Sequence, residues 1–123
     1  MTILALDFGT RRVGLAISHG VVAAPLQSIT YDRSNRQAFF DELKEIVLDQ
    51  KAEKIIVGLS LRDGEPTKQS EISRQIGEEI SEKLDISVDF VDESFTSVEA
   101  KENDAKDIDS ESAKIILERF LPR

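Results

Sequence analysis

Hydrophobic positions along the chain follow two patterns, compact apolar runs and stripes with helical spacing. Three compact runs, at residues 3–8, 13–18 and 54–59, are typical of strands buried on both faces of a sheet. Segments 23–31 and 86–91 alternate apolar and polar residues, which predicts two further strands. Pro25 indicates that the beginning of the third strand lies at an edge of the sheet, because proline cannot donate a ladder hydrogen bond.

Helical spacing predicts three main helices and one short one. The first starts at Ser34, where Gln37 completes a capping box, and runs to about Gln50. The second follows the polar loop 60–67, with Asp63-Gly64 as a turn, and ends near Leu84. A second capping box, Thr96 with Glu99, opens the short helix, and the charged segment 101–107 follows it. The last helix carries apolar residues at i, i+3, i+4, i+7 and i+8, namely Ala113, Ile116, Leu117, Phe120 and Leu121.

The predicted order of elements is therefore β-β-β-α-β-α-β-α(α). A three-strand meander that leads into βαβ units indicates an α/β fold with a mixed sheet and helices on both faces. The length of 123 residues is that of one domain, so we expect residues 1–123 to form a single unit.

The composition narrows the class of protein. With 40% hydrophobic and 33% charged residues, the chain resembles a soluble globular protein, and no stretch has the length of a membrane span. The start of the chain lacks the layout of a signal peptide, and there is no cysteine, so we expect a cytoplasmic protein. The net charge of −8 argues against a non-specific nucleic-acid binder, so a polyanionic partner would require a local basic patch or metal ions.

Asp7 interrupts the first apolar run and is the first candidate functional residue. A buried carboxylate needs a partner, a strand end or a metal ion. The turn that follows, Gly9-Thr10-Arg11-Arg12, joins two strands as a hairpin and combines a small loop with two guanidinium groups. Gly14 in the second strand leaves a bare backbone that a ligand can approach closely. These features predict an acidic centre beside a phosphate-sized anion site.

Further acidic residues follow other predicted strands. In mixed sheets of this kind, ligands bind beyond the carboxyl ends of the parallel strands. Asp7 lies near the end of the first strand, Asp92 and Glu93 close the fifth, and Asp109 lies one turn before Ala113 on the last helix. A carboxylate cluster without histidine or cysteine suits Mg²⁺ or Mn²⁺. Two such ions can clamp the attacking and leaving oxygens in phosphodiester hydrolysis.

Each candidate also has a structural explanation. Asp109 fits the N-cap of the last helix, and Asp92 and Glu93 fit a solvated strand end. Arg11 and Arg12 fit an exposed turn. Only the convergence of these segments on one edge of the sheet favours a functional site.

The chain resembles the YqgF/RuvX family, which is a family of bacterial RNase H-like proteins. The resemblance is colinear over nearly the whole chain. It rests on five segments: Leu6-Asp-Phe-Gly-Thr-Arg-Arg-Val-Gly-Leu-Ala16, Ile56-Val-Gly-Leu59, Asp92-Glu93, Thr96-Ser-Val-Glu-Ala100 and Ile108-Asp-Ser110 through Leu117. Members are similar to Holliday junction resolvases and are assigned to the maturation of pre-16S rRNA.

The resemblance implies an RNase H-like fold with a five-stranded mixed sheet in the order 3-2-1-4-5. It also implies metal binding by Asp7, by an acid at Asp92-Glu93 and by Asp109. The sequence departs from the family pattern at Ser94, where arginine is usual, at Ser60, where proline is usual, and in the shortened segment between residues 100 and 109.

Three functions follow as hypotheses. The leading one is a metal-dependent nuclease that acts on structured nucleic acid, RNA in preference to DNA, as a monomer or weak homodimer. Asp7, Glu93 and Asp109 would be catalytic, and Thr10, Arg11, Arg12 and Lys114 would bind the substrate. The second is a non-catalytic RNase H-like module that binds RNA or a ribosome-assembly factor. The third, an actin-like ATPase, would need a second lobe that 123 residues cannot supply.

Overall fold

The computed structural model describes residues 1–9, 11–92 and 108–121, with the backbone alone for residues 108–111. The strands are β1 (Ile3–Phe8), β2 (Arg12–Ser18), β3 (Ala23–Pro25), β4 (Ile29–Thr30), β5 (Lys54–Leu59) and β6 (Ser87–Asp92). The helices are a 3-10 turn, η1 (Arg33–Asn35), and the α-helices α1 (Arg36–Gln50), α2 (Lys68–Leu84) and α4 (Ile108–Phe120). The Thr96–Glu99 capping box, the short helix it would open and the charged segment 101–107 lie outside the described residues.

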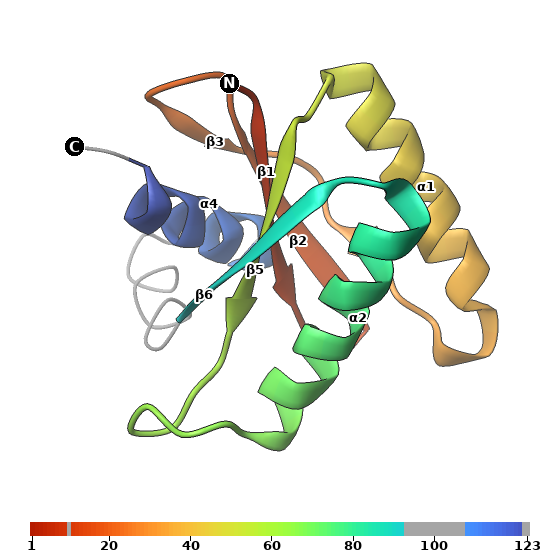
Figure 1. The fold of residues 1–123 in the computed structure, drawn as a ribbon, viewed down its shortest axis with the longest axis vertical. Coiled ribbons are helices and arrows are strands. Elements are labelled where there is room, and N and C mark those ends of the chain that lie inside the picture. The colour runs from red at the N-terminus through yellow and green to blue at the C-terminus, as the bar shows by residue number, and fades with distance from the viewer. Residues whose placement is uncertain (10, 93–107, 122–123) are drawn as a thin grey trace.

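The strands form one mixed sheet in the order β3-β2-β1-β5-β6, with β4 also paired to β2. β1 is antiparallel to β2 and parallel to β5, and β5 is parallel to β6. This confirms the expected α/β fold, and the order agrees with 3-2-1-4-5 once β3 and β4 count as one interrupted strand. Figure 1 shows the carboxyl ends of β1 and β5 pointing to the same edge of the sheet.

The prediction of one continuous third strand over residues 23–31 was wrong. β3 pairs with β2 in a register that matches Ala16 with Pro25, whereas β4 matches Val13 with Ile29. The two registers differ by one residue, so the chain bulges between the two short strands and the ladder is interrupted there. Pro25 lies on the edge strand β3, as predicted.

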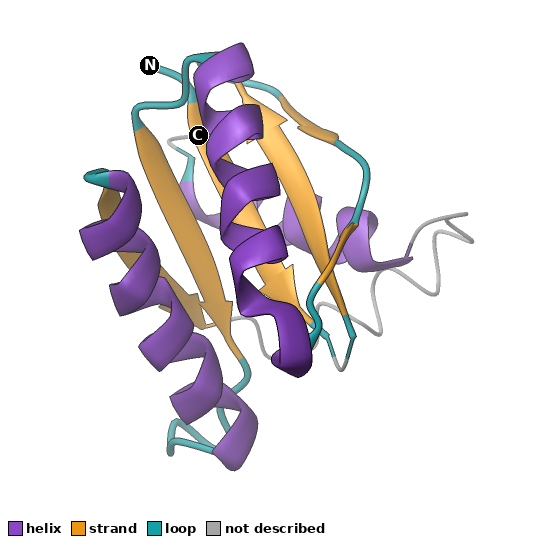
Figure 2. Cartoon of the chain, turned by 90° about the vertical axis from the view of Figure 1, so that its right-hand side faces the viewer, coloured by secondary structure: helices purple, strands orange, loops and turns teal. Residues whose placement is uncertain are grey.

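The sheet separates two apolar cores. Leu4 and Leu6 of β1 point to the side covered by α1 and α2, whereas Ile3 and Ala5 point to the side covered by α4. Figure 2 shows α1 and α2 lying side by side in front of the strands, with α4 behind them. This alternation fixes the face on which every strand residue lies.

The helices begin and end at identifiable capping residues. The predicted Ser34–Gln37 capping box was wrong, because Asp32 accepts hydrogen bonds from the Ser34 backbone N–H and hydroxyl and so engages Ser34 in η1. The N-cap of α1 is instead Asn35, whose side chain accepts from the Ala38 N–H. Helix α2, by contrast, ends at Leu84 as expected. In the described part of the chain, no helix has the length and apolarity needed to cross a membrane.

Candidate active site

Asp7 is the penultimate residue of β1 and is only 9% exposed. Strand alternation places it on the α4 face of the sheet, in line with Ile3 and Ala5. Burial of a carboxylate at a strand end is costly unless its charge is balanced, and this is the environment that the sequence predicted.

The positions beside Asp7 on the sheet carry no side chains. Gly14 of β2 is its direct partner in the antiparallel ladder. On the other side, β5 pairs with β1 up to Leu6 and Val57, so the next residue on each strand places Gly58 beside Asp7. Gly14 and Gly58 are both buried. The absence of a side chain on either side gives a ligand of the Asp7 carboxylate close access to the sheet.

The two arginines of the hairpin lie on different sides of it. Arg12 is the first residue of β2 and alternates with Gly14 and Ala16, which places it on the α4 face with Asp7. Arg11 lies in the loop before β2 and lines a cleft together with Tyr31. The loop is closed by a hydrogen bond of 2.8 Å from the Gly9 N–H to the Arg12 carbonyl. Thr10 lies outside the described residues.

Asp92 and Asp7 are on opposite faces of the sheet. On β6, Val88 and Phe90 pack with the α1/α2 core, and Asp92 continues that alternation. Asp92 pairs in register with Leu59, which also belongs to that core. Glu93, the other acid of the predicted pair, lies outside the described residues.

Helix α4 supplies the remaining candidates. Asp109 is its second residue, inside the helix rather than at the N-cap position, and its backbone lies one turn before the buried Ala113. Lys114 is half-buried. Ser112 is 1% exposed, and its Oγ has no hydrogen-bond partner within the described part of the chain. The position of Ser112 four residues before Ile116 places it on the buried stripe of the helix.

The donor set of this face suits a hard divalent cation. Asp7 supplies a buried carboxylate, Ser112 supplies a buried hydroxyl that lacks a partner among the described residues, and both lie on the side of the sheet that α4 covers. Oxygen donors of this kind fit Mg²⁺ or Mn²⁺. The described residues contain no group of three acidic, histidine or cysteine side chains able to hold a metal ion. Of the expected metal-binding set, only Asp7 has a described side chain; the side chains of Glu93 and Asp109 lie outside the described part.

The loop between β5 and α2 forms a cleft at the same edge of the sheet. Asp63 and Gly64 both have positive φ, 51° and 79°, and form the tip of a tight turn, as the sequence predicted. Arg62 and Glu65 exchange two backbone hydrogen bonds of 2.9 and 2.8 Å across it. The cleft has a volume of about 730 Å³ and is lined by Ser60, Leu61, Arg62, Asp63, Gly64, Thr67 and Asp92.

The fold is RNase H-like, as a comparison with solved structures shows. RuvC of Thermus thermophilus in complex with a Holliday junction substrate superposes with a TM-score of 0.63 at 12% identity, over 94% of this chain and 90% of that chain. A second Thermus thermophilus RuvC structure gives a TM-score of 0.54 at 16% identity, over 100% of this chain and 84% of that one.

Sequence comparison identifies the family. The family described as "RuvX: Holliday junction resolvase" matches residues 1–123, and the chain belongs to it. A relative from Maridesulfovibrio salexigens is 37% identical over 100% of this chain and 99% of its own length. One from Burkholderia pseudomallei is 30% identical over 98% of this chain and 87% of its own. Both carry the name "Putative pre-16S rRNA nuclease".

Proposed function

We propose that this protein is a divalent-metal-dependent endonuclease that hydrolyses phosphodiester bonds in structured RNA, at the 5′ end of pre-16S rRNA. The observation that carries the proposal is the buried Asp7 carboxylate at the end of β1, with glycine as its ladder partner. Membership of the RuvX family and the names of its relatives support the proposed reaction class and substrate.

In this proposal three acids hold two metal ions. Asp7 contributes from β1, Glu93 follows β6 and Asp109 lies in the first turn of α4. Because Asp92 lies on the face opposite Asp7, Glu93 is the better candidate of the acidic pair. The bound ions would supply charge stabilisation for the attacking and leaving oxygens. The chain's own part is to keep the carboxylates in place at the edge of the sheet and on α4, and to leave room beside Asp7 at Gly14.

The substrate contacts in this proposal come from cations near the same edge. The chain carries a net charge of −8, so local cations and metal ions must offset the repulsion of RNA. Arg12 shares the face of Asp7, and Arg62 lines the cleft of the β5–α2 loop. Thr10, Arg11 and Lys114 complete the proposed substrate-binding set.

The experiment that tests the proposal compares two substrates. The purified protein is incubated with a precursor fragment that spans the 5′ end of 16S rRNA and, separately, with a four-way DNA junction. We expect Mn²⁺- or Mg²⁺-dependent cleavage of the RNA, abolished by EDTA. Cleavage of the DNA junction but not of the RNA would contradict RNA as the substrate. Binding of RNA without cleavage at any metal concentration would favour the non-catalytic module.

A further inference from the structure

A second cleft lies near the hairpin tip, apart from the Asp7 face. It has a volume of about 580 Å³ and is lined by Arg11, Thr30, Tyr31, Asp32 and Arg33. This volume is within the usual range for sites that bind small ligands. The residues come from the β1–β2 loop and from the segment that joins β4 to η1, so segments distant in sequence form one site.

The cleft gathers more positive than negative charge. Its lining contains two arginines and one aspartate. Neither arginine forms an ion pair with another residue in the described part of the chain. The Asp32 carboxylate accepts hydrogen bonds of 2.9 and 2.7 Å from Ser34, which lower its pKa and orient it within its own turn. The two guanidinium groups are thus available for an anion.

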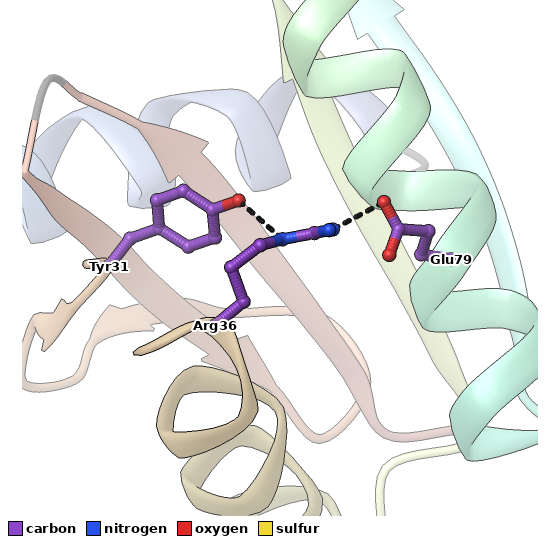
Figure 3. A network of polar contacts seen from close by, with 3 residues as sticks. All are labelled: Tyr31, Arg36 and Glu79. Atoms are coloured by element: carbon purple, nitrogen blue, oxygen red, sulfur yellow. Dashed lines mark hydrogen bonds and ion pairs between the residues drawn. The ribbon is translucent and has the colours of Figure 1, made fainter. Parts of the chain in front are cut away.

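Tyr31 is held in a fixed orientation at this cleft. Its hydroxyl accepts a hydrogen bond of 3.0 Å from Arg36 Nε, and Arg36 in turn forms an ion pair with Glu79 of α2 (Figure 3). The ring packs edge-to-face on Phe39 at 5.2 Å, with an angle of 82° between the planes. A half-buried aromatic ring that is held in place by residues of two helices is a pre-organised surface for a planar ligand.

The same ring borders a second, smaller pocket of about 70 Å³. It is lined by Phe8, Gly9, Tyr31, Arg33, Gln69, Ile72 and Ile76. The Gln69 amide donates a hydrogen bond of 3.3 Å to the Phe8 carbonyl. Tyr31 and Arg33 therefore stand between a wide charged cleft and a narrow pocket with both polar and apolar walls.

We infer that the Arg11–Tyr31–Arg33 cleft binds one unpaired nucleotide of an RNA strand. The phosphate lies between the two guanidinium groups, and the base stacks on Tyr31. Arginine matches phosphate geometry, and stacking on an aromatic ring is the usual way in which proteins hold an unstacked base. The inference rests on the proposed nucleic-acid substrate but requires no metal ion or cleavage.

The position of the cleft relative to Asp7 supports a continuous path for the strand. Arg11 and Arg12 are consecutive, yet Arg12 lies on the Asp7 face whereas Arg11 lines the cleft. A strand that crosses the hairpin tip would meet one arginine on each side. The cleft would then hold a nucleotide next to the scissile segment and so favour substrates with a single-stranded extension.

Fluorescence anisotropy with a labelled, short single-stranded RNA in EDTA tests this inference. We expect Arg33→Gln to weaken binding about fivefold and to lower the slope of log K against log salt by about 0.7, the value for one phosphate contact on a single strand. Tyr31→Leu should weaken binding about tenfold with an unchanged salt slope, because stacking releases no counterion. Tyr31→Phe keeps the ring and should bind nearly as well as the wild type.

Matched controls separate this inference from the nuclease proposal. Lys44→Gln removes one exposed cation from α1, far along the helix from η1, and should bind like the wild type. If Arg33→Gln binds RNA more weakly while the wild type shows no metal-dependent cleavage, the nucleotide site is supported and the nuclease proposal is refuted. Equal binding by Arg33→Gln and Lys44→Gln, or full competition by polyglutamate of the same charge, would overturn the nucleotide site.

Discussion

Gly77 of α2 packs directly against the ring of Phe90 on β6, and its replacement by alanine gives a sharp test of the packing. A Cβ at position 77 would lie 2.7 and 2.8 Å from two ring carbons of Phe90 and 3.4 Å from Val57 Cγ2. Carbon atoms in contact are about 3.5–4.0 Å apart, so the overlap is about 0.7 Å or more. The Arg74 guanidinium lies 4.7 Å from the centre of the same ring, so a shift of Phe90 disturbs that contact too.

Two opposing effects set the magnitude for Gly77→Ala. Alanine is favoured over glycine in a helix interior by about 1 kcal/mol. Overpacking a well-filled site costs about 1–3 kcal/mol. We therefore expect a net loss of about 1 kcal/mol in the free energy of unfolding, and a melting temperature a few degrees lower.

Urea denaturation of a double-mutant cycle measures the two effects separately. In a Phe90→Ala background the clash is gone, so Gly77→Ala should stabilise the protein by about 0.5–1 kcal/mol. Glu78→Ala, at the exposed neighbouring position, should have almost no effect in either background. If Gly77→Ala raises stability equally in both backgrounds, the close packing of α2 on β6 is refuted.

Three further predictions concern the metal, a turn and the core. Mn²⁺ at ten times its dissociation constant should stabilise the wild type by about 1.4 kcal/mol, and Asp7→Asn should abolish this shift in thermal melts. The pKa of Asp32, lowered mainly by its hydrogen bonds from Ser34, should lie below the ordinary aspartate value in an NMR titration. The stabilisation that these hydrogen bonds give to the folded protein is then present above the unfolded-state pKa and is lost as the pH falls through the folded-state pKa. An ordinary pKa for Asp32 would contradict this prediction. Leu117→Ala, at a fully buried position between α4 and the sheet, should cost about 2–5 kcal/mol by urea denaturation, and a cost below 1 kcal/mol would contradict its place in that core.

The fold could be predicted from the sequence because its strands and helices carry strong local patterns. The unbroken apolar runs at β1 and β5 indicated buried strands, and the 3.6-residue spacing along α2 and α4 indicated their buried faces. Asp7 was a clear candidate because a carboxylate inside an apolar strand is costly. The Asp63-Gly64 turn was predictable because the preference of these two residues for a turn is local.

Features that depend on which of several possible groups pair with one another could not be predicted. The bulge between β3 and β4 arises from two registers against β2, and no single segment specifies it. Asn35 rather than Ser34 is the N-cap because the backbone N–H and hydroxyl of Ser34 already donate hydrogen bonds to Asp32. The cleft around Tyr31 depends on Arg36 reaching Glu79, a residue of a different helix 43 positions later. The metal-site predictions for Glu93 and Asp109 concern side chains outside the described part of the chain and stay predictions.

Single-turnover cleavage of a precursor 16S rRNA fragment in Mn²⁺ tests the central claim most directly. The comparison is between the wild type, Asp7→Asn and Asp89→Asn, all purified identically. Asp89 is a half-exposed aspartate of β6 whose partner is Lys54 at 2.8 Å. It is not one of the proposed metal ligands, so its substitution removes the same charge without removing a ligand. Asp7→Asn keeps the side-chain volume, and we expect an unchanged or slightly higher melting temperature in the absence of metal. It predicts that cleavage falls by about two orders of magnitude or more for Asp7→Asn alone. Equal cleavage by all three proteins would contradict the account.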